Sequence, residues 1–250
     1  MKRRTLAMRV MPAFLLLMLY FDHAAAQFFG PPPGPQGPAR EVSPIDLAGQ
    51  WVAIVTEDWR FRMVVPPRGD YPGLPLNAAA RAAADDWDPA RDEEEGNACK
   101  GYGAGGIMRI PTRLRIEWVD DSTLQIRTDA GRQTRTLQFS DTPSREGDGS
   151  WQGVSVAEWE MHGRSGNGNL KAVTSDMRPG YFRKNGVPYS GEAVLTEFYD
   201  LLTQHDGSQW LVVLSILEDS SYFTQPIVTS TSFRREERRS GWNPTDCRVD

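Results

Sequence analysis

The stretch RLRIEWVDDSTLQIRT, residues 113–128, carries the pattern on which the fold prediction rests. In 113–119, apolar Leu114, Ile116 and Trp118 alternate with charged side chains, and apolar and polar side chains alternate again in 123–128. An alternation with a period of two residues is typical of a β-strand that has one face in the core and one in water. We therefore predict two strands here, each with one buried face.

The same pattern extends outward from this stretch over most of the chain. Further strand-like segments are 50–56, 60–65, 133–139, 153–160, 169–175, 193–201, 210–217 and 226–234. Roughly ten short strands at intervals of about 8–12 residues favour a sandwich or a barrel, and inside/outside alternation suits a barrel wall. We predict a mainly β fold, an antiparallel meander that closes into a barrel.

One segment differs from this β pattern. Residues 76–87 are rich in alanine, and Asn77 is a plausible N-cap for a helix in this segment. We predict one short helix near residues 77–87.

The N-terminal region has the features of an export signal. Three basic residues precede a short apolar run and then Ala24-Ala25-Ala26, a small-residue cleavage site. We expect a cleaved signal peptide at 1–26, a Pro/Gly-rich linker at 27–44 and a single β-rich domain at 45–250, in a periplasmic or secreted protein. An uncleaved anchor is the alternative, and Sec and twin-arginine export are both open. We expect no stable membrane insertion after cleavage.

Charge and composition exclude one class of partner. The first 26 residues hold four basic residues and one acidic residue, so the net charge of −5 for the whole chain becomes −8 without them. A surface of this sign disfavours binding to nucleic acid.

Only two cysteines are present, Cys99 and Cys247. In an oxidising compartment two thiols most simply form a disulfide with each other. A metal-binding or catalytic thiol is the alternative.

Several short motifs resemble those of a known set of proteins. The opening Asp46-Leu-Ala-Gly-Gln-Trp51 is similar to the start of a lipocalin-type barrel. The further motifs are Cys99-Lys-Gly-Tyr-Gly103, Met108-Arg-Ile-Pro111, Trp151-Gln-Gly-Val-Ser155, Ala157-Glu-Trp-Glu160, Gly186-Val-Pro-Tyr-Ser190, Leu195-Thr-Glu197 and Cys247. In this order they resemble a large set of exported bacterial lipocalin-like proteins, largely uncharacterised. The resemblance implies a lipocalin-like barrel and a Cys99–Cys247 disulfide, and it implies no reaction.

The candidate catalytic, metal and cofactor motifs lack the local structure or ligand spacing that these sites require. The glycine-rich residues 101–106 lack the preceding strand and following helix of a dinucleotide loop, so we expect a flexible loop. Ser155 lies in a strand rather than at a nucleophile elbow. His162 and His205 have no closely spaced ligand, and the acidic run 85–95 lacks the EF-hand spacing. We expect neither a metal nor a cofactor.

Aromatic and charged residues within the strands are the better candidates for a ligand site. Aromatic side chains build an apolar cavity, and Arg62, Arg109, Arg135, Arg183 and Glu197 supply convergent polar groups. The ligand-binding set that we predict is Trp118, Arg135, Trp159, Tyr181, Arg183, Glu197 and Tyr199. We expect Trp159 and Glu197 to face one cavity. The alternative is that the aromatic residues form core and the Arg–Glu pairs are structural.

Three functions fit this sequence. The first is an exported lipocalin-like protein that binds a small hydrophobic or amphipathic molecule in a barrel cavity. The second is an isomerase, cyclase or hydrolase in the same cavity, with Glu197 or Tyr181 handling the proton. The third is a non-catalytic accessory protein that binds another exported protein. The ligand, catalysis and the oligomeric state stay open.

Overall fold

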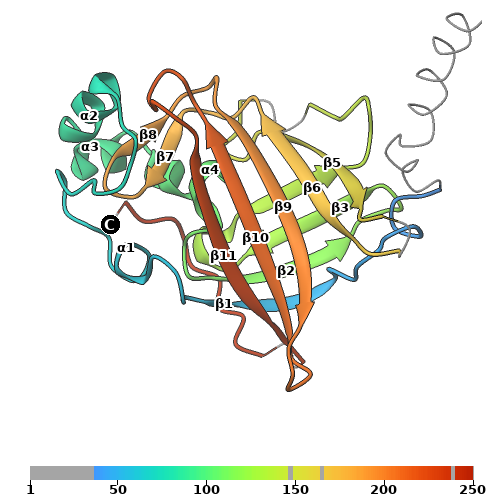
Figure 1. Ribbon diagram of the computed structural model, residues 1–250. Coiled ribbons are helices and arrows are strands. Elements are labelled where there is room, and N and C mark those ends of the chain that lie inside the picture. Colours follow the sequence, from blue (N-terminus) through green and yellow to red (C-terminus); the bar gives the residue numbers. More distant parts are fainter. Residues whose placement is uncertain (1–36, 146–148, 164–165, 238–239, 250) are drawn as a thin grey trace, which may run out of the picture. The chain divides into compact units, whose positions relative to one another are not determined.

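Nine strands close into a barrel in the computed structural model, which describes residues 37–145, 149–163, 166–237 and 240–249 (Figure 1). The expected signal peptide and most of the expected linker lie outside these residues. The barrel strands are β1 (Gly49–Ile54), β2 (Arg113–Trp118), β3 (Thr123–Thr128), β4 (Thr134–Gln138), β5 (Val154–Met161), β6 (Gly168–Ser175), β9 (Val194–Thr203), β10 (Gln209–Glu218) and β11 (Ile227–Glu236). The mainly β barrel predicted from the sequence is confirmed.

The strand order around the barrel is β1-β11-β10-β9-β6-β5-β4-β3-β2, and β2 pairs with β1 to close it. The neighbours are antiparallel except β4 and β5, which run parallel and pair over only two positions, Leu137 with Ser155 and Gln138 with Val156. A long connection separates these strands in the sequence, and β5 runs in the same direction as β4. The barrel is therefore mixed, with one parallel pair within the expected meander.

The alternation in 113–128 has the predicted consequence. Leu114, Ile116, Leu124 and Ile126 are each at most 2% exposed, while the residues between them are partly exposed. These side chains join Trp51 in a core that fills the inside of the barrel. Burial of a Leu or Ile side chain stabilises the fold by about 1.5–3 kcal/mol, so the alternation selects which face points inward.

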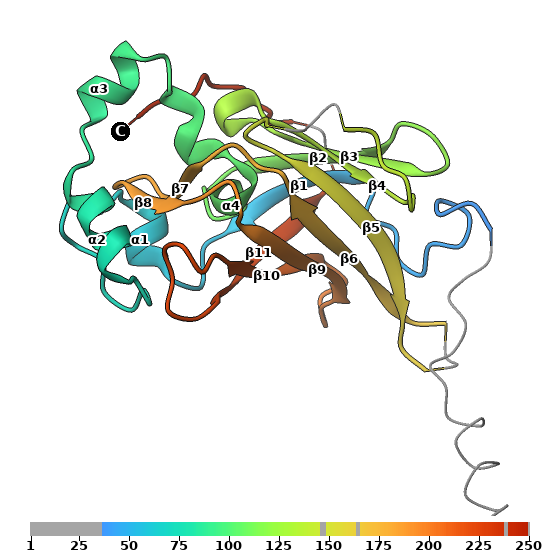
Figure 2. The ribbon, with the colours of Figure 1, turned by 90° about the horizontal axis from the view of Figure 1, so that it is seen from above.

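One end of the barrel is covered by short helices and a separate hairpin, and we call it the capped end (Figures 1 and 2). Its elements are α1 (Trp59–Met63), α2 (Ala78–Asp85), α3 (Pro89–Glu94), η1 (Ala98–Tyr102), α4 (Ala104–Ile107), β7 (Gly180–Arg183) and β8 (Val187–Tyr189). A second apolar cluster joins Ala104, Phe182 and Tyr189 of the cap to Leu195 and Leu217 of the barrel strands. A further short helix, η2 (Ala130–Arg132), lies between β3 and β4.

The helix predicted near residues 77–87 is confirmed as α2. Its N-cap is Asn77, whose side chain accepts a hydrogen bond of 2.9 Å from the amide of Ala80. The strand predicted at 60–65 is wrong, because residues 59–63 form α1 and only the residues after it are extended. The aromatic and branched side chains there suit a strand, but Phe61 and Arg62 turn inward in tertiary contacts that local propensity does not contain.

The glycine-rich residues 101–106 are not the flexible loop that we expected. They form the end of η1 and the turn of α4, and all of them are buried. The ring of Tyr189 packs so closely that a Cβ atom on Gly105 would lie 2.8 Å from its Cε1. The glycines therefore permit η1 and α4 to pack closely on β8.

The predicted disulfide between Cys99 and Cys247 is present, with Cα atoms 5.0 Å apart. It joins η1 to the C-terminal segment across a sequence separation of 148 residues. Near the N-terminus, Ala39 and Val42 pack against the barrel core, and the amide of Arg40 donates to the carbonyl of Asp121. The packed part of the chain thus begins before Ile45, where we expected the domain to start.

Candidate functional site

The seven predicted site residues make four different sets of contacts. Arg135, Glu197 and Tyr199 lie inside the barrel. Trp159 belongs to the same core cluster as Tyr199, and Trp118 packs against this cluster where β4 and β5 diverge. Tyr181 and Arg183 both belong to β7 of the capped end, but they make different contacts. The structure therefore does not bring the predicted set together into one cavity.

Inside the barrel, Arg135 and Glu197 form a fully buried ion pair. Arg135 Nη1 donates to Glu197 Oε1 at 3.0 Å and Nη2 donates to Oε2 at 2.5 Å, a two-pronged geometry. The Oη of Tyr199 lies 3.5 Å from Nη1, and Thr174 accepts from Nη2 at 3.4 Å. Only Nε of Arg135 lacks a partner among the described residues.

The electrostatics of this pair indicate a structural role. Burial by itself lowers the pKa of Arg135, but the Glu197 carboxylate outweighs it, and the pKa of Arg135 is raised. Burial raises the pKa of Tyr199. Each charge thus has its counter-charge at hydrogen-bond distance, and all three residues are completely buried. This arrangement balances the two charges inside the barrel, and it leaves Arg135 Nε as the one nitrogen of that guanidinium without a partner among the described residues.

Trp118 and Trp159 form an aromatic cluster with Phe139 where β4 and β5 diverge. The ring centroids of Phe139 and Trp159 are 5.2 Å apart, and those of Trp118 and Trp159 are 6.4 Å apart. Trp159 Nε1 donates to the carbonyl of Ala39 at 2.7 Å. The cluster borders an open groove of about 680 Å³, which Val156 also lines. Trp159 and Glu197 lie on strands flanking β6, in adjacent rows of the barrel wall.

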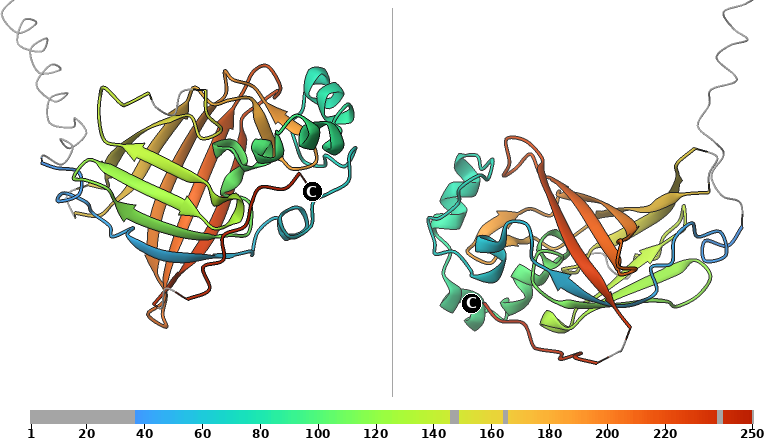
Figure 3. Two further views of the ribbon diagram at one scale, coloured as in Figure 1. Left: turned by 180° about the vertical axis from the view of Figure 1, so that it is seen from behind. Right: turned by 60° about the horizontal axis from the view of Figure 1, so that its bottom comes forward.

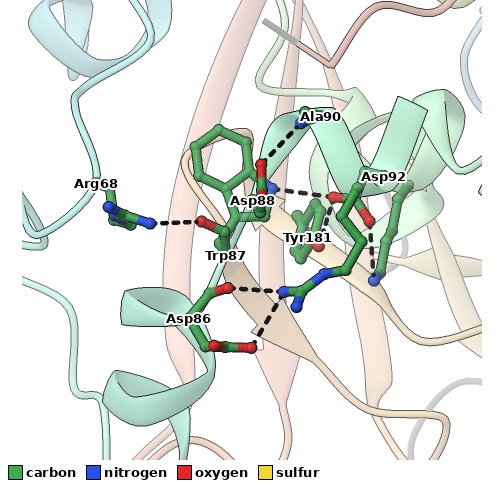
Figure 4. A network of polar contacts seen from close by, with 9 residues as sticks. Arg68, Asp86, Trp87, Asp88, Ala90, Asp92 and Tyr181 are labelled. Atoms are coloured by element: carbon green, nitrogen blue, oxygen red, sulfur yellow. Dashed lines mark hydrogen bonds and ion pairs between the residues drawn. The ribbon is translucent and has the colours of Figure 1, made fainter. Parts of the chain in front are cut away.

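Tyr181 belongs to a network centred on Asp92, which is nearly buried (Figure 4). Tyr181 donates to Asp92 at 2.7 Å, and Trp87 Nε1 donates to the same carboxylate at 3.0 Å. Lys100 lies 3.5 Å from Asp92, with its ammonium 4.7 Å from the centre of the Tyr181 ring. Burial raises the pKa of Tyr181, and its hydrogen bond to Asp92 adds to this shift. These contacts connect α3, η1 and β7.

Arg183 lies next to Arg62 and Arg109 at a pocket that we call the arginine pocket. Its volume is about 130 Å³, and its lining residues are Phe61, Arg62, Val65, Pro66, Gly101, Gly106, Arg109, Ile110, Pro111, Phe182, Arg183 and Lys184. Three separate segments of the capped end supply them. Among the described residues, no acidic side chain lines this pocket.

The three arginines are held by stacking and by two carboxylates behind the pocket. Arg183 lies over the ring of Phe61 at 4.4 Å from its centre, and Arg109 lies over Phe182 at 4.9 Å. Asp58 forms ion pairs with both Arg109 and Arg183.

Arg62 completes the cluster from α1. It pairs with Glu57, and its Nε donates to the carbonyl of Arg109 at 2.9 Å. Asp58 adopts a left-handed backbone with φ of 49°, an uncommon conformation that aspartate tolerates better than most residues.

Several donors of this cluster remain unsatisfied. Arg62 Nη2 and the Nε and Nη1 atoms of Arg183 are buried and have no hydrogen-bond partner among the described residues. The side chains of Arg62, Arg109 and Arg183 are each at most 8% exposed. Burial lowers the pKa of both Arg62 and Arg183, and the charge of Arg109 lowers them further. Three buried cations beside two partly exposed carboxylates therefore leave an excess of positive charge at the pocket, and three of their guanidinium nitrogen atoms have no hydrogen-bond partner among the described residues.

Arg62 and Arg109 were expected only as polar groups of a cavity and stood outside the predicted set, and neither Asp58 nor Phe61 was expected here. The dipeptide Phe-Arg occurs at 61–62, 182–183 and 233–234, so it does not by itself mark this pocket. In the structure the first two meet, since Arg183 stacks on Phe61. Stacked planar guanidinium groups are well suited to binding carboxylate or phosphate.

Within the described residues, no helix combines the length and apolar character needed to cross a bilayer. No group of three or more His, Cys, Asp or Glu side chains among them is arranged to hold a metal ion.

Comparison of the chain with protein-family models, curated proteins and solved structures finds no match.

Proposed function

We propose that this protein is an exported barrel protein that binds a small amphipathic molecule, with the anionic group of that molecule in the arginine pocket. The observation that carries the proposal is the set of three buried and unpartnered N–H groups on Arg62 and Arg183. A buried donor without a partner costs about 1–3 kcal/mol, and more when it is charged. An oxyanion in the pocket satisfies these donors and balances the excess positive charge.

The size of the pocket indicates which part of a ligand it holds. Small-molecule sites usually measure about 300–1,000 Å³. At about 130 Å³, the arginine pocket has room for a carboxylate or phosphate group but not for a whole ligand of ordinary size. The rest of the molecule extends out of the pocket past Val65, an apolar lining residue that is 39% exposed. Of the predicted site residues, Arg183 belongs to this proposed site, at the capped end rather than in the middle of the barrel.

The disulfide supports the proposed place of action. Disulfides persist in oxidising compartments and are rare in the cytosol. Cys99–Cys247 suits a periplasmic or secreted protein, in agreement with the export signal expected at residues 1–26.

The test is isothermal titration calorimetry of the purified protein with octyl phosphate, octanoate and uncharged octanol. We expect the two anions to bind and octanol to bind at least about tenfold more weakly, because it has no charge for the arginine donors. Arg183→Gln should weaken anion binding about tenfold or more.

The matched control is Arg127→Gln, which changes a half-exposed arginine paired with Glu117 on the barrel wall and should leave the affinity unchanged. Equal binding of octanol, or equal affinity in Arg183→Gln, contradicts the proposal.

A further inference from the structure

Exposed apolar side chains concentrate beside the arginine pocket. Eight large apolar side chains are exposed in the described residues, and four of them lie between positions 59 and 65. Trp59, Met63 and Val64 are 65%, 59% and 69% exposed, and Val65 is 39% exposed. Apolar residues scattered singly on a surface are common, but a cluster within seven residues indicates a binding surface.

The same segment lines the pocket and forms this patch. Phe61, Arg62 and Val65 line the arginine pocket, whereas Trp59, Met63 and Val64 point to solvent. Figure 3 shows α1 at the capped end, outside the barrel wall. An anion that enters the pocket is therefore flanked by exposed apolar side chains.

We propose that residues 59–65 are a membrane-contact surface, where Trp59, Met63 and Val64 enter the interfacial region of a lipid bilayer while the phosphate of an anionic lipid occupies the arginine pocket. The inference rests on the proposed function, since the same pocket receives the anionic group. It names the amphipathic molecule as a lipid presented by a bilayer.

The chemistry of the segment fits a lipid interface. Tryptophan is enriched at the membrane–water boundary, where its amphipathic ring lies at headgroup level. Basic residues near the surface attract anionic lipids. The basic side chains of the segment 57–70 and the pocket are Arg60, Arg62, Arg68, Arg109, Arg183 and Lys184, and the acidic ones are Glu57, Asp58 and Asp70. These acids form ion pairs with arginines of the same group, so basic charge is in excess.

The size of the patch favours a bilayer over a protein partner. A stable protein interface buries about 600–1,000 Å² on each partner and involves about 20–30 residues a side. Four side chains on one five-residue helix and its end supply only a small part of this. An interfacial membrane contact needs only a few inserted apolar side chains together with electrostatic attraction.

The experiment is co-sedimentation of the purified protein with vesicles of pure phosphatidylcholine or of phosphatidylcholine with phosphatidylglycerol. We expect binding to the anionic vesicles and little to the neutral ones. The double variant Trp59→Ser/Met63→Ser should lower the vesicle partition coefficient about tenfold or more, because both side chains lose their interfacial contact. The control Leu202→Ser replaces a side chain that is 48% exposed near the β9–β10 turn and should bind as wild type does.

The calorimetric titration with octyl phosphate separates this inference from the proposed function. Trp59→Ser/Met63→Ser should keep its affinity for octyl phosphate within about twofold, because the arginine donors are unchanged. A wild type that binds octyl phosphate but ignores anionic vesicles overturns the membrane surface and leaves the proposed function standing. Vesicle binding that survives in the double variant also overturns the membrane surface. If the wild-type protein does not bind octyl phosphate, both the membrane surface and the proposed function are overturned.

Discussion

The barrel interior and the capped end each bury arginine, but they satisfy it differently. Inside the barrel, Arg135 meets Glu197 through two parallel hydrogen bonds, and both side chains are completely inaccessible. At the capped end, Arg62, Arg109 and Arg183 share Glu57 and Asp58, and three of their N–H groups have no partner among the described residues. The first cluster is balanced in charge and leaves one nitrogen, Arg135 Nε, without a partner, while the second lines a pocket and is short of negative charge.

This difference shows how a structural arginine can be told from a binding one. Burial alone does not decide, because all four side chains are buried or nearly so. The deciding quantities are the number of counter-charges and whether residues with unpaired donor atoms line a pocket. The predictions that follow test whether stability depends on the first cluster and binding on the second.

The largest effect concerns the crosslink that holds the capped end. Replacing both cysteines, Cys99→Ser/Cys247→Ser, should lower the free energy of unfolding by about 4–5 kcal/mol. Without the crosslink, the unfolded chain has more conformational entropy, and this favours unfolding. Urea denaturation measures this. Hydrogen exchange should rise more in η1 and α4, beside the arginine pocket, than in β6 and β9. A loss below about 1 kcal/mol would show that the tail contributes little.

The next effect separates the two arginine clusters. Glu197→Gln should lower the free energy of unfolding by about 3 kcal/mol or more, because Arg135 is left buried without its counter-charge. Binding of octyl phosphate should be unchanged in this variant at temperatures where it is folded. Glu158→Gln, which changes an exposed partner of Lys171, is the control and should alter stability by less than about 0.5 kcal/mol. Wild-type stability in Glu197→Gln would refute the structural role of the pair.

Alkaline pH should act on the barrel interior through Tyr199. Its pKa in the folded protein is raised above the ordinary value of about 10, so the folded state keeps the proton that the unfolded state loses. The contribution of this pKa shift to the free energy of unfolding is fully present below about pH 10. It is lost as the pH rises toward the folded pKa, and the loss is about 1.4 kcal/mol at pH 11. Unfolding curves of Tyr199→Phe should therefore fall less steeply above about pH 10 than those of wild type. Parallel curves would contradict this.

The smallest effect concerns the carboxylate that competes with the ligand. Asp58→Asn removes a negative charge shared by Arg109 and Arg183, and asparagine tolerates the same left-handed backbone. The affinity for octyl phosphate should rise about fivefold, because the bound anion loses a repulsive neighbour. Calorimetry at constant salt measures it, and a weaker affinity in Asp58→Asn would show that Asp58 orients the arginines for binding.

Local patterns predicted the barrel well because strand alternation is a local property. The inward faces of β2 and β3, the helix capped by Asn77 and the pairing of two cysteines all follow from neighbouring residues or simple counting. The parallel β4–β5 pair does not, since it depends on how a long connection returns.

The arginine pocket could not be predicted from local patterns either, because Arg62, Arg109 and Arg183 lie far apart in the chain. They meet only when α1, the segment after α4 and β7 pack together. Conversely, Arg135 and Glu197 were predicted to bind a ligand, and the structure instead pairs them with each other. Residue type alone cannot distinguish these two outcomes.

A crystal structure of the protein with octyl phosphate tests the central claim most directly. We predict phosphate density in the arginine pocket, with oxygen atoms within about 3 Å of Nε and Nη1 of Arg183 and of Nη2 of Arg62. The Arg135–Glu197 pair should be unchanged in the same crystal. Phosphate bound inside the barrel or in the groove beside Trp159, with the arginine pocket empty at saturating ligand, would contradict the account.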